Sequence, residues 1–217
     1  MDTITTRETA EKELDLCRVD PVRFVERYCT ISGSGGTGPI ELTEYQKHFL
    51  RNLRGPGKTS VFETDDRSTG KTTAGRLASV SRAILFPGSS VVIYMKSNVR
   101  ARDALRTITA DVDSLPGWLR QKMIVKNDSI EFENGSRIFV VTRPESFRGK
   151  RAEITIVDLE SVYSTEKERA ELFRSVDPRS KVGIVELPPL EPSSDKYERI
   201  KNDEEVAIRP GVNQETW

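Results

Sequence analysis

The sequence has few of the residues on which metal and nucleophile chemistry usually depends. Among its 217 residues there is one histidine, His48, and there are two cysteines, Cys17 and Cys29, without Cys-x-x-Cys spacing. We therefore expect neither a histidine-ligated zinc site nor a Ser-His-Asp triad. Two isolated cysteines fit a reducing compartment, where they serve as small core residues.

Long apolar runs and an excess of one charge are also missing. No run approaches the roughly 18 residues that a membrane span needs, and the polar N-terminus does not read as a signal peptide. Lys plus Arg and Asp plus Glu each total 34, so the net charge is zero. Any nucleic-acid site must therefore be a local basic patch. The length suits one large domain or a domain with an appendage.

The stretch that carries a chemical signal is residues 64–73, which reads Thr-Asp-Asp-Arg-Ser-Thr-Gly-Lys-Thr-Thr. It follows an apolar run at 60–62 and precedes a helical pattern at 74–85, which is the strand, loop and helix context of a phosphate-binding loop. In such a loop, backbone N–H groups and the positive end of the helix dipole meet phosphate oxygens. Lys71 would then contact the β and γ phosphates, and Thr72 would bind Mg²⁺.

A second strand and a second polar segment extend this interpretation. Residues 154–158 read Ile-Thr-Ile-Val-Asp, a buried parallel strand whose terminal carboxylate, Asp158, would hold Mg²⁺ through water opposite Thr72. In the Tyr45-Gln46 pair, a Gln amide can donate and accept at an adenine edge while an aromatic ring stacks on the base. The alternatives are ordinary core packing for this pair and, because Asp65 replaces the usual first Gly, a plain helix start with a surface lysine at 71.

The order of apolar patterns predicts an α/β fold with a mainly parallel sheet, flanking helices and an inserted β-hairpin. We expect helices over 8–17, 21–28, 44–50, 74–85, 100–112 and 164–173, with a last one over 193–201. We expect strands over 60–62, 90–95, 123–125, 129–132, 137–141, 154–158 and 181–185. Asn134-Gly135 favours a hairpin turn because both residues accept positive φ. The glycine-rich stretch 32–39 reads as a flexible loop.

In this order the motifs resemble the ATPase domain of tailed-phage large terminases, the motors that drive double-stranded DNA into procapsids. The resemblance covers roughly residues 20–190 and includes the Tyr-Gln segment, the Gly-Lys-Thr loop, a Phe-Arg-Gly segment at 147–149 and the Ile-Val-Asp strand. It implies a P-loop NTPase fold of the ASCE or RecA-like class. It further implies a helical arm and flexible loop over 1–40, an ATPase domain over 41–210 and a tail over 211–217, with no room for the family's nuclease domain.

The resemblance also implies roles for matched residues. Arg67 would neutralise the γ phosphate in cis, and Arg148 would act as a trans-acting arginine finger in a ring of subunits; the alternative for Arg148 is a structural arginine. The Tyr-Gln segment would bind the adenine of ATP. The residues implied to bind the nucleotide are therefore Tyr45, Gln46, Arg67, Ser68, Thr69, Gly70, Lys71, Thr72 and Thr73.

Two departures from the family pattern affect hydrolysis. Leu159 stands where the family places a catalytic Glu, and Glu160 follows it. In an extended strand Glu160 points to the same face as Asp158, so Glu160 could orient the attacking water. The segment 186–189, Glu-Leu-Pro-Pro, has the proline but not the hydroxyl residue of the usual coupling motif.

The leading hypothesis is therefore an ATP-hydrolysing, DNA-translocating motor domain that uses ATP and Mg²⁺ in the host-cell cytoplasm and works as a homo-oligomeric ring without a membrane. The family resemblance implies double-stranded DNA, a portal protein and a small terminase subunit as partners. The alternatives are a helicase-like P-loop motor, a nucleotide-binding scaffold with weak or no hydrolysis and, least favoured, a small-molecule kinase. Candidate DNA contacts, each also readable as a solvated charge, are Lys96, Arg100, Lys150 and Arg151.

Overall fold

The computed structural model describes residues 7–33, 36–53, 59–63, 70–95, 97–158, 171–172, 174–176, 179–186 and 207–208. The helices are α1 (Arg7–Val19), α2 (Pro21–Tyr28), α3 (Glu44–Asn52), α4 (Lys71–Leu85) and α5 (Asn98–Asp113), with a short 3-10 helix η1 (Pro144–Phe147). The strands are β1 (Thr30–Gly33), β2 (Gly36–Pro39), β3 (Thr59–Glu63), β4 (Ser90–Met95), β5 (Met123–Val125), β6 (Ser129–Phe132), β7 (Arg137–Val141), β8 (Ile154–Asp158), β9 (Lys181–Glu186) and β10 (Ala207–Ile208).

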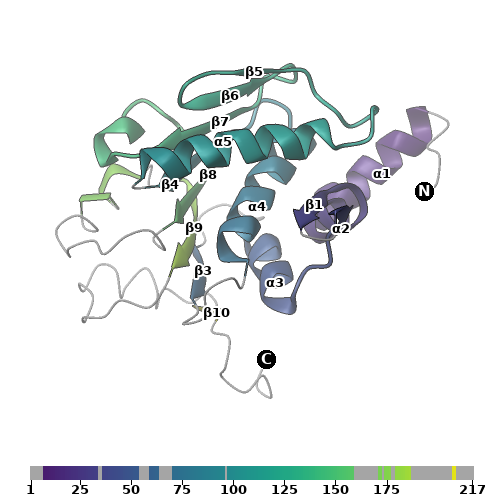
Figure 1. Ribbon diagram of the computed structural model, residues 1–217, viewed down its shortest axis with the longest axis horizontal. Coiled ribbons are helices and arrows are strands. Elements are labelled where there is room, and N and C mark those ends of the chain that lie inside the picture. The colour runs from purple at the N-terminus through teal and green to yellow at the C-terminus, as the bar shows by residue number, and fades with distance from the viewer. Residues whose placement is uncertain are drawn as a thin grey trace.

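Eight of these strands form one sheet in the order β10-β3-β9-β8-β4-β7-β6-β5 (Figure 1). The strands from β10 to β7 are parallel, and β6 and β5 continue the sheet as antiparallel strands. The predicted mainly parallel sheet with an inserted hairpin is therefore confirmed. Parallel strands end at one common edge, so the ends of β3, β8 and β4 meet there, with β9 placed between β3 and β8.

Each face of the sheet carries its own apolar layer. Side chains alternate along β4, so that Ile93 contributes to the large core under α4 and α5 while Tyr94 points to the other face. Figure 1 shows α4 and α5 lying against the sheet on one side. On the opposite face, the ring of Phe147 from η1 stacks on Tyr94 with 6.0 Å between centroids. The η1 turn is therefore anchored in a second, smaller apolar cluster.

The two N-terminal helices belong to the main core. Phe24 and Val25 of α2 are fully buried, and the two cysteines, Cys17 and Cys29, are free and buried in the same layer. Burial raises the pKa of the Cys29 thiol to about 12, so it stays protonated and unreactive at neutral pH. This environment agrees with the prediction of small core residues.

Helix starts follow the predicted capping chemistry. Asp20 accepts a hydrogen bond from the Val22 N–H at 3.1 Å, with Pro21 in the first turn. Thr43 caps α3 in a full capping box with Gln46, which places two otherwise unpaired donors in hydrogen bonds. The helix predicted from residue 74 begins earlier, at Lys71, because Gly70 takes the cap position.

The stretch that the sequence predicted as a flexible loop, residues 32–39, is the main difference. Thr30–Gly33 and Gly36–Pro39 pair as antiparallel strands β1 and β2, with Thr30 opposite Pro39 and Ile31 opposite Gly38. The loop prediction is therefore wrong over the described part of this stretch. Strand pairing depends on backbone groups, which glycine carries like any residue, so composition alone was misleading. The predicted helix over 193–201 and most of that over 164–173 lie outside the described residues.

The two helices that cover the sheet are joined by a buried ion pair. Arg76 of α4 donates to the carboxylate of Asp111 on α5, and both side chains are largely buried. Burial raises the pKa of the Asp111 carboxyl, and the neighbouring Arg76 opposes this by favouring the charged form.

Among the described residues, we find no helix that combines the length and the apolar character of a membrane span.

Gly183 of β9 allows α3 to approach the sheet closely. A Cβ atom there would lie 2.9 Å from Phe49 Cζ and 3.0 Å from Leu53 Cδ2, both in α3 or at its end. We expect Gly183→Ala to lower the free energy of unfolding by about 1–3 kcal/mol in urea denaturation, because the added methyl overpacks this contact. Gly117→Ala is the matched control, since a Cβ there meets nothing within 4 Å. Equal stability of the two variants would contradict the close approach.

The Arg76–Asp111 pair gives a second expectation, for a double-mutant cycle. Removing either partner alone, as Arg76→Met or Asp111→Leu, should lower the free energy of unfolding by about 3 kcal/mol or more, because the remaining charge is buried without its partner. The double variant should be much less destabilised than the sum of the two single variants. Urea denaturation of all four proteins measures the coupling, and additive losses would show that the pair is not coupled.

Candidate nucleotide-binding site

The site is centred on the first turn of α4. Gly70 has a left-handed backbone, with φ of 80°, and its carbonyl accepts the Ala74 N–H at 2.8 Å, which closes the first turn. Lys71 and Thr72 follow directly, and the Lys71 side chain is only 2% exposed. Residues 64–69, which include the predicted contacts Arg67, Ser68 and Thr69, lie outside the described part of the chain.

The hydroxyl of Thr72 donates a hydrogen bond to Oδ2 of Asp158 at 2.9 Å, across a sequence separation of 86 residues. Asp158 ends β8 and is 1% exposed. The parallel register of β8 with β4, in which Asp158 lies beside Met95, brings this carboxylate to the sheet edge where α4 begins. Both groups are oxygen ligands of the kind that Mg²⁺ prefers, so the pair fits a magnesium site.

A cavity of about 370 Å³ opens beside this contact, between the starts of α4 and α5 and the ends of β4 and β8. The polar residues of its wall are Thr72, Thr73, Arg76, Arg100, Asp103, Thr107 and Asp158. The wall from α5 was not predicted from the sequence. Arg100, Thr107 and Asp111 share one side of that helix by their spacing, but this spacing does not reveal which side faces α4.

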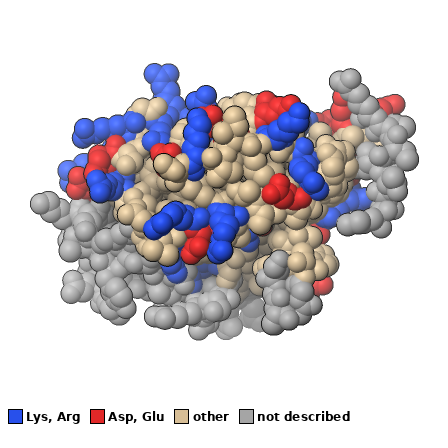
Figure 2. All heavy atoms as spheres, turned by 45° about the horizontal axis from the view of Figure 1, so that its top comes forward, with Lys and Arg blue, Asp and Glu red and all other residues tan. Residues whose placement is uncertain are grey.

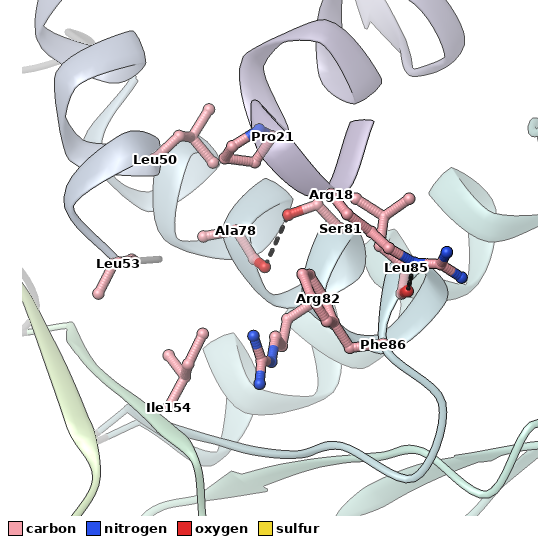
Figure 3. A pocket seen from close by; sticks show the side chains of 10 residues that line it. All are labelled: Arg18, Pro21, Leu50, Leu53, Ala78, Ser81, Arg82, Leu85, Phe86 and Ile154. Atoms are coloured by element: carbon pink, nitrogen blue, oxygen red, sulfur yellow. Dashed lines mark hydrogen bonds between the residues drawn. The ribbon is translucent and has the colours of Figure 1, made fainter. Parts of the chain in front are cut away.

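A second hollow, drawn in Figure 3, lies among α1, α3 and α4 and measures only about 30 Å³. Arg18 donates to the Leu85 carbonyl at 2.8 Å, and the Arg82 guanidinium lies 4.1 Å from the centroid of the Phe86 ring. Most of the other labelled side chains in Figure 3 are apolar. A hollow of this size holds about one water molecule, so it is no alternative site for a nucleotide.

The predicted adenine-binding pair sits at the start of α3. Gln46 is 7% exposed, and its Oε1 accepts the Thr43 N–H at 2.9 Å while its Nε2 donates to the Gly70 carbonyl at 3.3 Å. Tyr45 is half-buried against the main core. The Gln46 side chain thus contacts the Gly70 carbonyl at the start of α4, a contact that the sequence did not suggest.

The two remaining catalytic candidates differ in what the structure says of them. Arg148 is exposed and directly follows Phe147, which packs on the sheet face opposite α4. It therefore does not share the cavity beside Thr72. Glu160 and its neighbour Leu159 lie outside the described residues, so the water-orienting role of Glu160 stays a prediction.

We compared the sequence and the fold with those of known proteins. No family model matches the sequence, and no curated protein matches it. Among solved structures, the chain is similar to the large-terminase ATPase domain of Thermus phage P74-26, with 15% identity and a TM-score of 0.53 over 70% of this chain and 67% of that chain.

Two further structures are less similar to this chain, with TM-scores below 0.5. The N-terminal domain of the DNA packaging ATPase from bacteriophage phi29 matches with a TM-score of 0.47 and 10% identity, over 67% of this chain and 80% of that one. The UvsW helicase from bacteriophage T4 matches with a TM-score of 0.48 and 11% identity, over 81% of this chain and 59% of that one. The fold of this chain is thus similar to that of the large-terminase ATPase domain of Thermus phage P74-26.

Proposed function

We propose that this chain is an ATP-hydrolysing motor domain of a viral DNA-packaging terminase, which moves double-stranded DNA into a procapsid. The observation that carries the proposal is the contact between Thr72 and Asp158 at the start of α4, directly after Gly70 and Lys71. In P-loop NTPases, a hydroxyl at the start of the helix and a carboxylate at a strand end hold the metal beside the bound triphosphate. The cavity of about 370 Å³ beside the contact supplies the space.

Each residue of the site has a defined task under this proposal. Thr72 and Asp158 would hold Mg²⁺, which neutralises phosphate charge when bound. Lys71 binds the β and γ phosphates from the first turn of α4, and the N–H groups of that turn orient the same oxygens. Arg67 neutralises the charge that develops on the γ phosphate, and Glu160 holds the attacking water in line.

Arg148 completes the site of a neighbouring subunit. Its exposure, together with its place on the sheet face opposite α4, supports a role outside its own cavity. A ring of identical chains would then put each Arg148 at the next chain's γ phosphate. Portal and small terminase proteins are the partners that such a ring would need.

Substitutions at three of these positions should separate binding from turnover. We expect Lys71→Ala to lose both ATP affinity and hydrolysis, whereas Glu160→Gln and Arg148→Ala lose turnover by about a hundredfold or more and keep affinity. DNA-stimulated phosphate release and nucleotide titration measure the two quantities. Mixing inactive Glu160→Gln with inactive Arg148→Ala subunits should restore part of the activity.

Arg143→Ala is the matched control for Arg148→Ala, because Arg143 is an exposed arginine at the other end of η1. Turnover that is equal in the Arg143 and Arg148 variants would remove the finger role. Tight ATP binding by the wild-type chain without turnover, even in an assembled ring, would instead favour a nucleotide-binding scaffold, which Leu159 in the usual position of Glu would explain.

DNA contact is proposed for two of the four basic candidates. Figure 2 shows Lys and Arg side chains at several separate points of the surface, with Asp and Glu beside many of them. Arg100 and Arg151 are exposed and form no ion pair with a carboxylate in the described part of the chain. Lys150 instead donates to the Ser146 carbonyl at 3.0 Å and lies 5.1 Å from the Phe139 ring centroid, and Lys96 lies outside the described residues.

Phosphate contacts make binding sensitive to salt. We expect Arg100→Gln and Arg151→Gln each to weaken binding of double-stranded DNA of any sequence and to lower the slope of log affinity against log salt by about one. Arg106→Gln is the control on the same helix as Arg100, since Arg106 is already paired with Asp103 at 3.2 Å. Fluorescence anisotropy at four salt concentrations gives the slopes. The assignment fails when all three variants change the slope equally.

A further inference from the structure

The Gln46 amide, in the first turn of α3, also bonds to Gly70, which lies 24 residues later at the start of α4. At one end, Oε1 accepts the Thr43 N–H at 2.9 Å and completes the cap of α3. At the other, Nε2 donates to the Gly70 carbonyl at 3.3 Å. Because the side chain is only 7% exposed, water competes little for either bond.

The Gly70 carbonyl lies at the N-cap position, directly before the first turn of α4. It already accepts the Ala74 N–H at 2.8 Å, so the Gln46 donor occupies its second acceptor direction. The Gly70 carbonyl and the Lys71 N–H belong to one planar peptide unit, so the orientation of the carbonyl determines where the Lys71 N–H points. Holding the carbonyl therefore holds the first turn of α4 in the conformation that meets phosphate oxygens.

Shape and packing reinforce the same contact. A Cβ atom on Gly70 would lie 2.2 Å from Nε2 of Gln46, so the two residues are fitted to each other and Gly70 leaves no room for a side chain. The α3 helix is in turn fixed against the sheet, where Phe49 is fully buried close to Gly183 of β9. Gln46 is thus presented from a rigid support rather than from a loose loop.

We propose that Gln46 is a positioning residue for the first turn of α4: it fixes the Gly70 carbonyl and thereby raises affinity for a triphosphate whatever base the ligand carries. The inference rests on the proposed function, since it concerns the same site. It differs from the adenine-reading role that the family resemblance implies for Gln46. A group that reads adenine affects only ligands with that base, whereas a group that preorganises the loop affects all triphosphates alike.

Inorganic tripolyphosphate separates the two roles because it has no base. Isothermal titration of the full chain with Mg²⁺-tripolyphosphate and with Mg²⁺-ATP should show both affinities falling by the same factor, about fivefold, in Gln46→Glu and in Gln46→Met. Gln46→Glu keeps the acceptor for Thr43 but has no donor for Gly70. Gln46→Met keeps the side chain neutral, so a loss shared by both variants cannot be charge repulsion.

Thr43→Ala is the matched control, because it weakens the cap of α3 without touching Gly70. We expect it to leave both affinities within twofold of the wild-type values. If Thr43→Ala weakens tripolyphosphate binding as much as the Gln46 variants do, the effect is one of helix stability and the proposal fails. Loss of ATP affinity alone, or no loss for either ligand, also overturns it.

Amide hydrogen exchange tests the contact without any ligand. The Ala74 amide, which bonds to the Gly70 carbonyl, should exchange faster in Gln46→Met, while amides in the middle of α5 keep their rates. Unchanged exchange at Ala74 would overturn the inference even if binding changes. A wild-type chain that binds neither triphosphate would reject the proposed function instead, so the two failures are distinguishable.

Discussion

The hydrogen bond between Thr72 and Asp158 is the interaction on which the arrangement of the site depends. It joins the start of α4 to the end of β8, across 86 residues of the chain, while β9 lies between β8 and β3, the strand that precedes α4. Such a contact forms only when β3, β9 and β8 are parallel and in register, because only then do their ends meet at one edge. The geometry of the site therefore depends directly on the order and direction of the strands in the sheet.

Much of this fold was predictable because its signals are local. Continuous apolar runs predicted β4 and β8 as buried strands, the Asn134-Gly135 pair predicted the β6–β7 turn, and Asp20 predicted the start of α2. The β1–β2 pairing was missed because its residues are mainly Gly, Ser and Thr, which pattern as a loop when no partner strand is visible.

The candidate site was likewise predictable only where the sequence carries a local signal. The sequence predicted Lys71 and Thr72 from their spacing after a strand and Asp158 from its place at a strand end, and the structure brings Thr72 and Asp158 into contact. Two other contacts left no local signal in the sequence. The Arg76–Asp111 pair joins residues 35 positions apart, the Gln46–Gly70 bond joins residues 24 positions apart, and both depend on how the helices pack. Arg67 and Glu160, which carry much of the proposed chemistry, rest on the sequence alone.

The stacking of Phe147 on Tyr94 constrains the residue that follows it. Phe147 is 4% exposed and fastened to the sheet, so the backbone of Arg148 is one residue from a fixed point. The Arg148 guanidinium then changes its position mainly by rotation about its own side-chain torsions, within about a few ångströms. An anion contacts this guanidinium only when another molecule brings the anion within reach of the side chain, because the backbone beside Phe147 is held against the sheet.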